Sequence, residues 1–355
     1  MPYRLSWLRA APLEDITLPL LWVLIGPKAG DNSQILRAAE ASGLAFETRR
    51  IAIRQGHETL KPRVTPSLAH VDAALSDALG PPWPRVVLAI GRHMSLVALW
   101  IKQQSGGKTR IALFNTPKGA TGAFDLVVLP PYYRATGRPN EMVIRMPLIG
   151  IDPGRLAEAR DSFRDALGAM PRPLHVLLAG GDMGQRKLKP DFALDILRRM
   201  QAGFASTGSI YVATSRRTPA VAGEALAAAL RPQDRIFRWG RDQAPNPYLG
   251  LLAHGDSFTV TADSLSMLIE VARLGKPLLV AEPPELRGLS GALARLGAGW
   301  RARDLGKALQ LLYDSGHAAR FGAPLLAPPS PLADDTALVG ERLCQLADGT
   351  VERKA

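Results

Sequence analysis

Short apolar runs and helical stretches alternate along the chain in two successive series. Apolar runs of strand length predict strands buried on both faces, and apolar residues three or four positions apart predict helices between them. Alternation of this kind is typical of a parallel sheet covered by helices on both sides. In the first series we expect strands at residues 20–25, 46–53, 86–90, 111–115 and 126–130, and helices at 33–42, 67–79 and 95–104.

The second series begins after residues 138–153, where three prolines and the step Leu148-Ile149-Gly150 predict a crossing between domains. We therefore expect an N-terminal Rossmann-like domain at residues 1–150 and a C-terminal one at 151–332. In the second series the pattern predicts strands at 176–179, 210–213, 236–239, 258–261 and 278–280, a helix at 155–167, two helical stretches after the last strand, and a helix at 333–346 within a segment, 333–355, that packs back on the N-terminal domain.

Residues 256–282 read as one strand, helix, strand unit at the end of the second series. Asp263 is a good N-cap for the helix, because its carboxylate can accept hydrogen bonds from free backbone N–H groups. Gly275 supplies the left-handed residue at which the helix ends. A crossover this short predicts two parallel strands that lie close together in the sheet.

Three polar residues fall at the start and on one face of this helix. Ser264 lies at its N-terminus, and Ser266 and Glu270 are four residues apart on the face opposite the apolar stripe. Free N–H groups and hydroxyls at a helix start can hold a phosphate, and Glu270 is placed to accept hydrogen bonds from a ribose. Equally consistent with the sequence are two capping serines and a solvated surface glutamate.

Loops after two other predicted strands carry further candidates for nucleotide binding. Gly180 and Gly181 permit a ligand to approach the backbone closely, although a simple turn is the alternative. Ser215, Arg216 and Arg217 precede a proline at the first position of a helix. Arginines beside hydroxyls at a helix start favour phosphate binding more than either feature does alone.

Candidates outside these loops are less specific. Tyr248 lies in a proline-rich turn and could stack near a base or pack as a surface aromatic. In the first series, Asp31 could act as a general base or bind an acceptor hydroxyl, and Lys28 could contact a phosphate. His93 adds a titratable group after the third strand, but a lone histidine is more often structural.

Composition narrows the class of protein. The chain has 355 residues, 46% of them hydrophobic and 21% charged, as expected for a globular protein with room for two domains. No run approaches the roughly 20 apolar residues of a membrane span, and no secretory signal is evident, so we expect a cytoplasmic protein. Cys344 is the single cysteine, which excludes an internal disulfide, and no cysteine and histidine cluster predicts a metal site.

The net charge of +12 requires an explanation. The explanation ranked first is surface composition. The chain's abundance of alanine, arginine, proline and glycine is typical of a GC-rich bacterial genome, which favours arginine at the surface. A phosphorylated substrate or peripheral contact with an anionic membrane ranks second. Nucleic acid ranks last, because no recognition module with interleaved aromatics is present.

No G-x-G-x-x-G follows the first strand, so a dinucleotide redox enzyme has little support.

Several pieces of the sequence occur in an order that resembles the mitochondrial fission "elongated mitochondria" family, whose bacterial members are often described as predicted nucleoside-diphosphate-sugar epimerases. The resemblance covers roughly residues 20 to 345. One departure is Pro131-Tyr132-Tyr133, where the family pattern has a histidine and aspartate pair. The matching pieces are Gly30 to Gln34, Gly91-Arg92, Phe124 to Val128 with Pro130, Gly180-Gly181, Thr214 to Pro219, Tyr248 to Ala253, Val260 to Met267, Glu270 and Gly275 to Pro277.

The resemblance implies an α/β protein with a GT-B-like fold, in which two Rossmann-type domains face each other across a cleft and the second binds the nucleotide. It implies a metal-independent glycosyltransferase that needs no cofactor and uses a nucleotide-diphosphate sugar, with a glycan or lipid-linked acceptor in bacterial envelope glycan or glycolipid synthesis. In such enzymes a helix glutamate binds the donor ribose, and Glu270 occupies the matching place. The alternatives are a nucleotide-sugar 2-epimerase on the same fold and a non-catalytic recruitment protein at a membrane.

Overall fold

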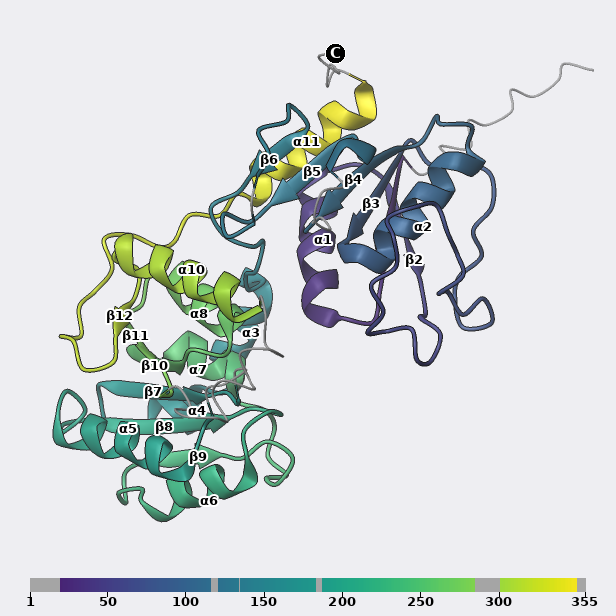
Figure 1. Ribbon diagram of the computed structural model, residues 1–355. Coiled ribbons are helices and arrows are strands. Elements are labelled where there is room, and N and C mark those ends of the chain that lie inside the picture. The colour runs from purple at the N-terminus through teal and green to yellow at the C-terminus, as the bar shows by residue number, and fades with distance from the viewer. Residues whose placement is uncertain (1–19, 116–120, 134, 183–186, 285–300, 350–355) are drawn as a thin grey trace, which may run out of the picture. The chain divides into compact units, whose positions relative to one another are not determined.

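The computed structural model describes residues 20–115, 121–133, 135–182, 187–284 and 301–349. Its chain divides into two compact units. Unit 1 comprises Met1–Val128, Gly137–Met142 and Thr336–Ala355, and unit 2 comprises Leu129–Thr136 and Val143–Asp335. Figure 1 labels the elements of both units. No helix among the described residues is long and apolar enough to cross a membrane.

Unit 1 is built on a six-stranded sheet in the order β2-β1-β3-β4-β5-β6, with parallel pairing from β2 through to β5. The central strands β1, β3 and β4 are almost wholly buried, as their continuous apolar sequences predict. The strands are β1 Leu21–Ile25, β2 Phe46–Arg50, β3 Val86–Ile90, β4 Arg110–Phe114, β5 Leu126–Leu129 and β6 Glu141–Val143, and the helices are α1 Ala29–Ser42, α2 Gly91–Gln104 and α11 Thr336–Asp348.

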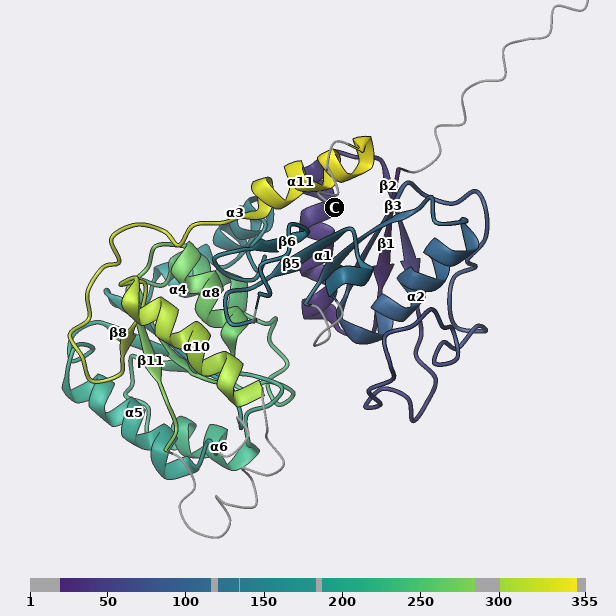
Figure 2. The same ribbon diagram turned by 45° about the horizontal axis from the view of Figure 1, so that its top comes forward.

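The last helix, α11, packs against α1 of the same unit, and Figure 2 shows the two helices side by side. Gly340 is required at this contact, since a Cβ there would lie 2.5 Å from the carbonyl oxygen of Ala41. The Cys344 thiol donates a hydrogen bond to the Ser42 carbonyl at 2.9 Å. The final helix therefore covers a helix near the start of the chain.

Unit 2 contains the second six-stranded sheet, in the order β12-β11-β10-β7-β8-β9, and all of its strand pairs are parallel. Helices α5 and α6 cover one face, and α7, α8 and α10 cover the other (Figure 1). The strands are β7 Leu174–Ala179, β8 Ser209–Thr214, β9 Arg235–Phe237, β10 Ser257–Thr261, β11 Leu278–Ala281 and β12 Ala319–Arg320, and the helices are α3 Pro153–Ser162, α4 Arg164–Gly168, α5 Pro190–Ala202, α6 Ala220–Ala228, α7 Tyr248–His254, α8 Leu265–Arg273 and α10 Arg301–Asp314.

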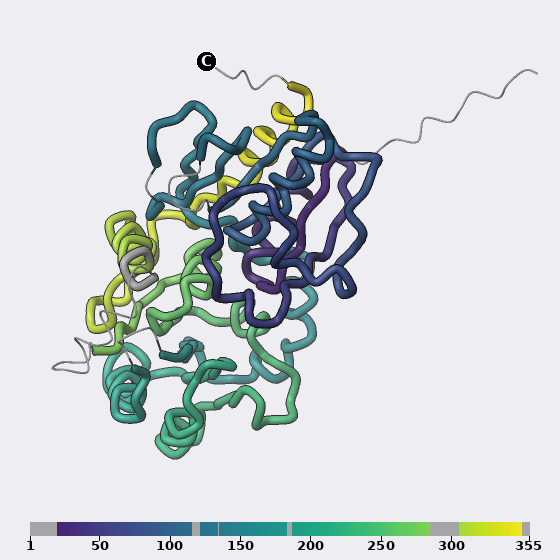
Figure 3. Tube along the Cα trace, turned by 45° about the vertical axis from the view of Figure 1, so that its right-hand side comes forward, coloured from purple at the N-terminus to yellow at the C-terminus, as the bar shows by residue number. Residues whose placement is uncertain are grey.

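The expected α/β class with two parallel sheets is confirmed, but the helix expected at residues 67–79 is wrong. That segment runs irregularly along the free edge of β2, within the loop that Figure 3 shows as dark blue tube outside the sheet. Its polar side chains bond the strand edge instead of forming helix caps. Asp77 accepts from Arg50 N–H at 2.7 Å, and Ser76 accepts from Ala52 N–H at 2.9 Å.

Other differences lie at element boundaries. Helix α1 begins at Ala29 rather than near Ser33, and the helix expected at 155–167 is two helices separated at Phe163. Pro219 is the N-cap of α6 rather than its first residue. One of the two helical stretches expected after β11 is α10, and residues 285–300 lie outside the described part of the chain.

Candidate functional site

The order of strands in the second sheet creates a point where a ligand can enter. From β7 the chain builds outward through β8 and β9, and then returns to place β10 on the other side of β7. Loops at the carboxyl ends of β7 and β10 therefore leave in opposite directions, and ligands of such sheets usually bind at this point. Gly180 and Gly181 follow β7, while Asp263 and Ser264 follow β10.

Asp263 ties the loops after β7, β8 and β10 together. Its buried carboxylate accepts hydrogen bonds from Gly181 N–H at 2.8 Å and from the Thr261 hydroxyl at 2.6 Å, and it pairs with Arg217 at 2.8 Å. Burial raises the pKa of Asp263, although these donors oppose the shift. The expected N-cap role is wrong: the N-cap of α8 is Ser264, because the Asp263 carboxylate is turned toward the β7 loop.

The two glycines after β7 are needed for this packing. A Cβ on Gly180 would lie 2.1 Å from an Asp263 carboxylate oxygen, and one on Gly181 would lie 2.3 Å from the Arg217 carbonyl. Gly180 N–H also donates to the Thr261 hydroxyl at 2.7 Å. Protein atoms therefore occupy the space that a side chain would need, and any ligand must approach the loop from its other side.

The loop after β8 is folded around the hydroxyl of Thr218. That oxygen accepts from Ser215 N–H at 2.8 Å and lies 2.8 Å from the Ala179 carbonyl and 2.5 Å from the Gly180 carbonyl, so it links the β8 loop to the β7 loop. Both arginines are exposed, but Arg217 pairs with the buried Asp263 carboxylate. The two adjacent arginines thus differ, because Arg217 helps to hold the loops together.

Helix α8 presents its N-terminus at the same edge of the sheet. Ser264 makes no side-chain cap, and its hydroxyl lies 3.3 Å from that of Ser266 on the first turn. Ser264 is buried and Ser266 is exposed. The first N–H groups of a helix have no partner within the helix, so this end combines a partial positive charge with two hydroxyls.

Glu270 lies one turn further along α8 and is held by Tyr248. The tyrosine hydroxyl donates a hydrogen bond to Glu270 Oε2, and its ring packs partly buried against the core of unit 2. Burial raises the pKa of Glu270, and burial together with the Glu270 charge raises the pKa of Tyr248 well above its ordinary value. Glu270 is therefore not a solvated surface charge. Its second oxygen has no hydrogen-bond partner among the described residues.

In unit 1 the residues expected on the acceptor side lie between β1 and β3, where the strand order of the first sheet reverses as it does between β7 and β10 in the second. Lys28 is the N-cap of α1 and its ammonium lies 4.0 Å from the Asp31 carboxylate. Asn32, which the sequence did not single out, fixes this loop. Its side chain accepts from Gly26 N–H at 3.0 Å and donates to the Gly26 carbonyl at 2.8 Å.

The first turn of α2, which follows β3 directly, brings His93 to this edge beside a second histidine, His70, from the long 51–85 segment. The His70 ring hydrogen-bonds the His93 carbonyl at 3.0 Å, and the two ring centroids are 5.3 Å apart. Burial lowers the pKa of both histidines, and neighbouring positive groups, Lys28 and Arg92 among them for His93, lower it further. Both rings are therefore held neutral near pH 7, and His70 supports the segment that replaces the expected helix.

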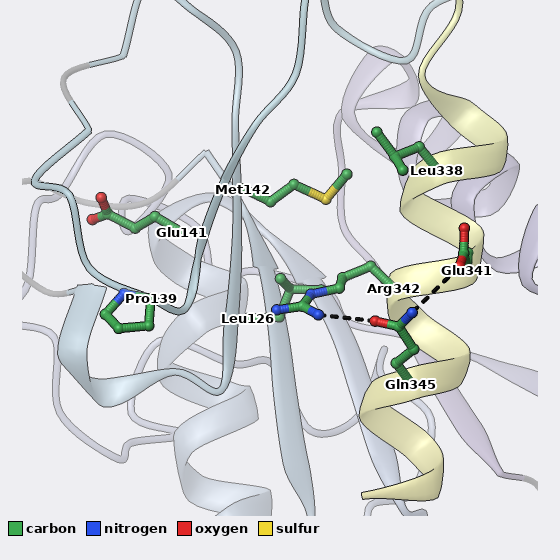
Figure 4. Close-up of a pocket in the computed structure, with 8 residues that line it drawn as sticks. All are labelled: Leu126, Pro139, Glu141, Met142, Leu338, Glu341, Arg342 and Gln345. Carbon is green, nitrogen blue, oxygen red and sulfur yellow. Dashed lines mark hydrogen bonds between the residues drawn. The ribbon is translucent and has the colours of Figure 1, made fainter. Parts of the chain in front are cut away.

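A pocket of about 320 Å³ lies elsewhere in unit 1, between α11 and the β5–β6 edge (Figure 4). Arg342 reaches across it and donates to Gln345 at 2.8 Å, and Gln345 in turn donates to Glu341 at 3.3 Å. The three polar side chains that α11 contributes to the pocket are thus hydrogen-bonded to one another along one face of the helix. The lining residues are Leu126, Pro139, Glu141, Met142, Leu338, Glu341, Arg342 and Gln345.

The expected nucleotide residues of unit 2 lie in the loops after β7, β8 and β10 and on helices α7 and α8. Thr218 and Thr261 join them and were not among the expected residues, because a threonine hydroxyl that links two loops leaves no spacing signal in the sequence. The residues in question are Gly180, Gly181, Ser215, Arg216, Arg217, Tyr248, Asp263, Ser264, Ser266 and Glu270.

Solved structures similar to this chain include an epimerase and a glycosyltransferase. UDP-GlcNAc 2-epimerase from Methanocaldococcus jannaschii matches with a TM-score of 0.49 and 13% identity, over 93% of this chain and 99% of that one. A glycosyltransferase from Rickettsia africae matches with a TM-score of 0.46 and 10% identity, over 94% of this chain and 99% of that one.

Two relatives are similar to this chain in sequence, and a family profile matches most of it. The Arabidopsis thaliana protein described as mitochondrial fission protein ELM1 is 29% identical over 219 residues, which are 56% of this chain and 51% of that protein. Uncharacterized protein RP120 of Rickettsia prowazekii is 22% identical over 240 residues, 58% of this chain and 67% of the relative. The chain therefore spans about half the length of the Arabidopsis relative. The sequence profile of the family described as Mitochondrial fission ELM1 matches residues 29–338, and the chain belongs to this family.

Proposed function

We propose that unit 2 binds a nucleotide-diphosphate sugar at the carboxyl edge of its sheet and that the protein is a metal-independent glycosyltransferase. The observation that carries this proposal is the arrangement on α8. Its N-terminus offers N–H groups and the hydroxyls of Ser264 and Ser266, and Glu270 stands one turn beyond with one oxygen held by Tyr248. A diphosphate fits the first feature and a ribose diol the second.

Glycosyl transfer has simple requirements at such a site. The acceptor hydroxyl attacks the anomeric carbon, the bond between that carbon and the diphosphate oxygen breaks, and a base takes the hydroxyl proton. The electron pair of the broken bond stays on the departing diphosphate, which gains one negative charge that needs stabilisation. Arg216, whose side chain is exposed, together with Ser215 and the start of α8, supplies cationic and N–H groups for that role. We assign Lys28 and Asp31 of unit 1 to the acceptor side, with Asp31 as the base.

A second candidate is a nucleotide-binding protein without turnover. It is favoured by the acceptor-side residues, since Lys28 and Asp31 lie within 4.0 Å of each other and are partly exposed. In the described part of unit 1, no residue that was expected to act as a base is both buried and placed to accept a proton. The Tyr132-Tyr133 pair, in place of the family's histidine and aspartate, points the same way.

Isothermal titration of the protein with UDP, GDP, ADP, CMP and their sugar conjugates tests the binding site. We expect selective binding by the wild type that is weakened at least tenfold by Glu270→Ala and by Arg216→Ala. Arg235→Ala, on the exposed part of β9, is the matched control and should bind as the wild type does. No binding of any of these nucleotides would refute the site.

Turnover separates the two candidates once a nucleotide has been found. Release of nucleoside diphosphate from its sugar conjugate, dependent on an acceptor and lost in Asp31→Asn, supports glycosyl transfer. Saturable binding with no release in a panel of glycan and lipid-linked acceptors supports the non-catalytic candidate.

A further inference from the structure

Trp239 is a large aromatic residue that stays exposed at the carboxyl edge of the second sheet. Its exposed fraction is 47%, although tryptophan is usually well buried. It follows β9 directly, and its N–H donates to the Thr214 hydroxyl at the end of β8, at 2.9 Å. Trp239 is thus fixed beside the loop that starts at Ser215.

Trp239 lies at the carboxyl edge of the sheet, beside the loop that carries Ser215. Ala213 of β8 pairs with Phe237 of β9, and Trp239 stands in the turn that follows β9. Its backbone N–H reaches Thr214, the last residue of β8 and the residue before Ser215. The indole is therefore carried at the same edge of the sheet as the loops after β7, β8 and β10.

The turn that carries Trp239 is braced by two ion pairs. Arg238 donates from its guanidinium to Asp242 at 2.8 Å, and Asp242 also accepts from Arg238 N–H at 2.7 Å. Arg241 pairs with Glu224 of α6 at 2.7 Å. A braced turn holds the backbone that carries the indole in place before any ligand arrives, which reduces the entropy lost on binding.

We infer that Trp239 is the stacking platform for the nucleobase of the bound nucleotide. This inference rests on the proposed function and names the subsite that reads the base. It replaces Tyr248 as the stacking residue, since the Tyr248 hydroxyl is bonded to Glu270 and its ring packs against the core. Stacking on an aromatic face tolerates any base, so Trp239 provides affinity and the surrounding polar groups provide base selectivity.

The test compares nucleotides with fragments that lack a base. Wild type, Trp239→Ala and Trp239→Phe are titrated calorimetrically with UDP, GDP, ADP and inorganic pyrophosphate, after thermal unfolding has shown that the variants are folded. We expect Trp239→Ala to bind each nucleoside diphosphate roughly tenfold more weakly and pyrophosphate as the wild type does. Trp239→Phe, which keeps an aromatic face, should retain most of the affinity.

Tryptophan fluorescence supplies an independent readout. Stacking on a base should quench part of the wild-type emission, and this quenching should vanish in Trp239→Phe although the calorimeter still detects binding. Nucleotide affinity and quenching unchanged in the Trp239 variants would overturn the inference and leave the proposed site intact. Wild-type protein that binds no nucleotide at all would overturn both.

Discussion

At the scale of single residues, the Tyr248 and Glu270 pair makes the sharpest prediction about stability. Glu270 is an acid whose pKa is raised by burial, and the Tyr248 hydroxyl is its hydrogen-bond donor. Removing a donor to a charged group usually costs about 1.5–3 kcal/mol. We expect Tyr248→Phe to lower the free energy of unfolding by that amount in urea denaturation.

Glu270→Gln is the matching change, because it keeps an acceptor for Tyr248 and removes a poorly solvated charge. It should leave the free energy of unfolding unchanged or slightly higher at pH 7. In the double variant, Tyr248→Phe should cost less than it does alone, since the remaining amide is neutral. Additive effects in this cycle would show that the two side chains do not interact.

Gly180 provides a second prediction at this scale. Since a Cβ at Gly180 would meet the Asp263 carboxylate at 2.1 Å, Gly180→Ala must displace the residue that ties the two loops together. We expect the free energy of unfolding to fall by roughly 1–3 kcal/mol, the usual cost of overpacking, which would appear as a lower urea midpoint. Gly223→Ala is the control: its Cβ would meet only the Thr214 methyl, at 3.7 Å. If Gly180→Ala and Gly223→Ala lowered the free energy of unfolding equally, the close contact between Gly180 and Asp263 would not be the cause.

The sequence predicted which loops form the candidate site but not how they are held. Strand ends, glycines and hydroxyls next to helix starts are local signals, so they placed Ser215, Ser264 and Glu270 at one edge of a parallel sheet. Asp263 has the local signal of an N-cap, but bonds from the β7 loop and Arg217 outcompete capping. Partners that are distant in sequence leave no periodic trace, which is why Thr218 and Asn32 were missed.

At the scale of elements, buried strands were predicted best, because a continuous apolar run has few alternatives in a sheet covered on both faces. The 67–79 segment shows the opposite case. Its helix-like composition is overridden by bonds from the edge of β2, and an isolated helix of that length is marginal by itself. Local pattern therefore failed where an exposed sheet edge offered partners for the backbone.

The 67–79 segment is expected to become less stable against local opening in acid. His70 and His93 have pKa values below the ordinary 6.5, so the unfolded chain binds protons more readily than the folded one. Stability is consequently fully present above about pH 6.5 and falls as the pH drops toward the folded-state values. Hydrogen exchange in residues 54–72, corrected for its intrinsic pH dependence, should show less protection at pH 5.5 than at pH 7.5.

His57, Lys28 and Arg92 add to the positive field around these rings, so acid protonation brings like charges together. Replacing both histidines by glutamine should flatten the change in protection between the two pH values. His175, buried in β7, also has a pKa lowered by burial, so the free energy of unfolding of unit 2 falls in acid as well. The local readout in residues 54–72 is needed for that reason, and unchanged acid sensitivity in the double variant would rule the histidines out.

At the scale of the whole molecule, the chain forms two α/β units, each with its own sheet, and unit 1 contains both early and final segments of the sequence. Helix α11 returns to α1 after the chain has built unit 2, so unit 1 cannot be complete until the last helix has been made. A chain arranged in this way is expected to show more than one unfolding transition. The two transitions offer a way to locate ligand binding.

A nucleotide that binds at the edge of the second sheet should stabilise unit 2 selectively. At a concentration one hundred times its Kd, a ligand adds about 2.7 kcal/mol, which corresponds to a shift of roughly 5–10 °C for a domain of this size. Calorimetry should therefore show one transition rising with nucleotide, and Gly180→Ala, which weakens unit 2, identifies that transition by lowering it. Glu270→Ala, which weakens binding at least tenfold, should reduce the shift to about half or less without lowering the other transition. A nucleotide that instead raises only the transition insensitive to Gly180→Ala binds to unit 1, and the assignment of the donor site would have to move there.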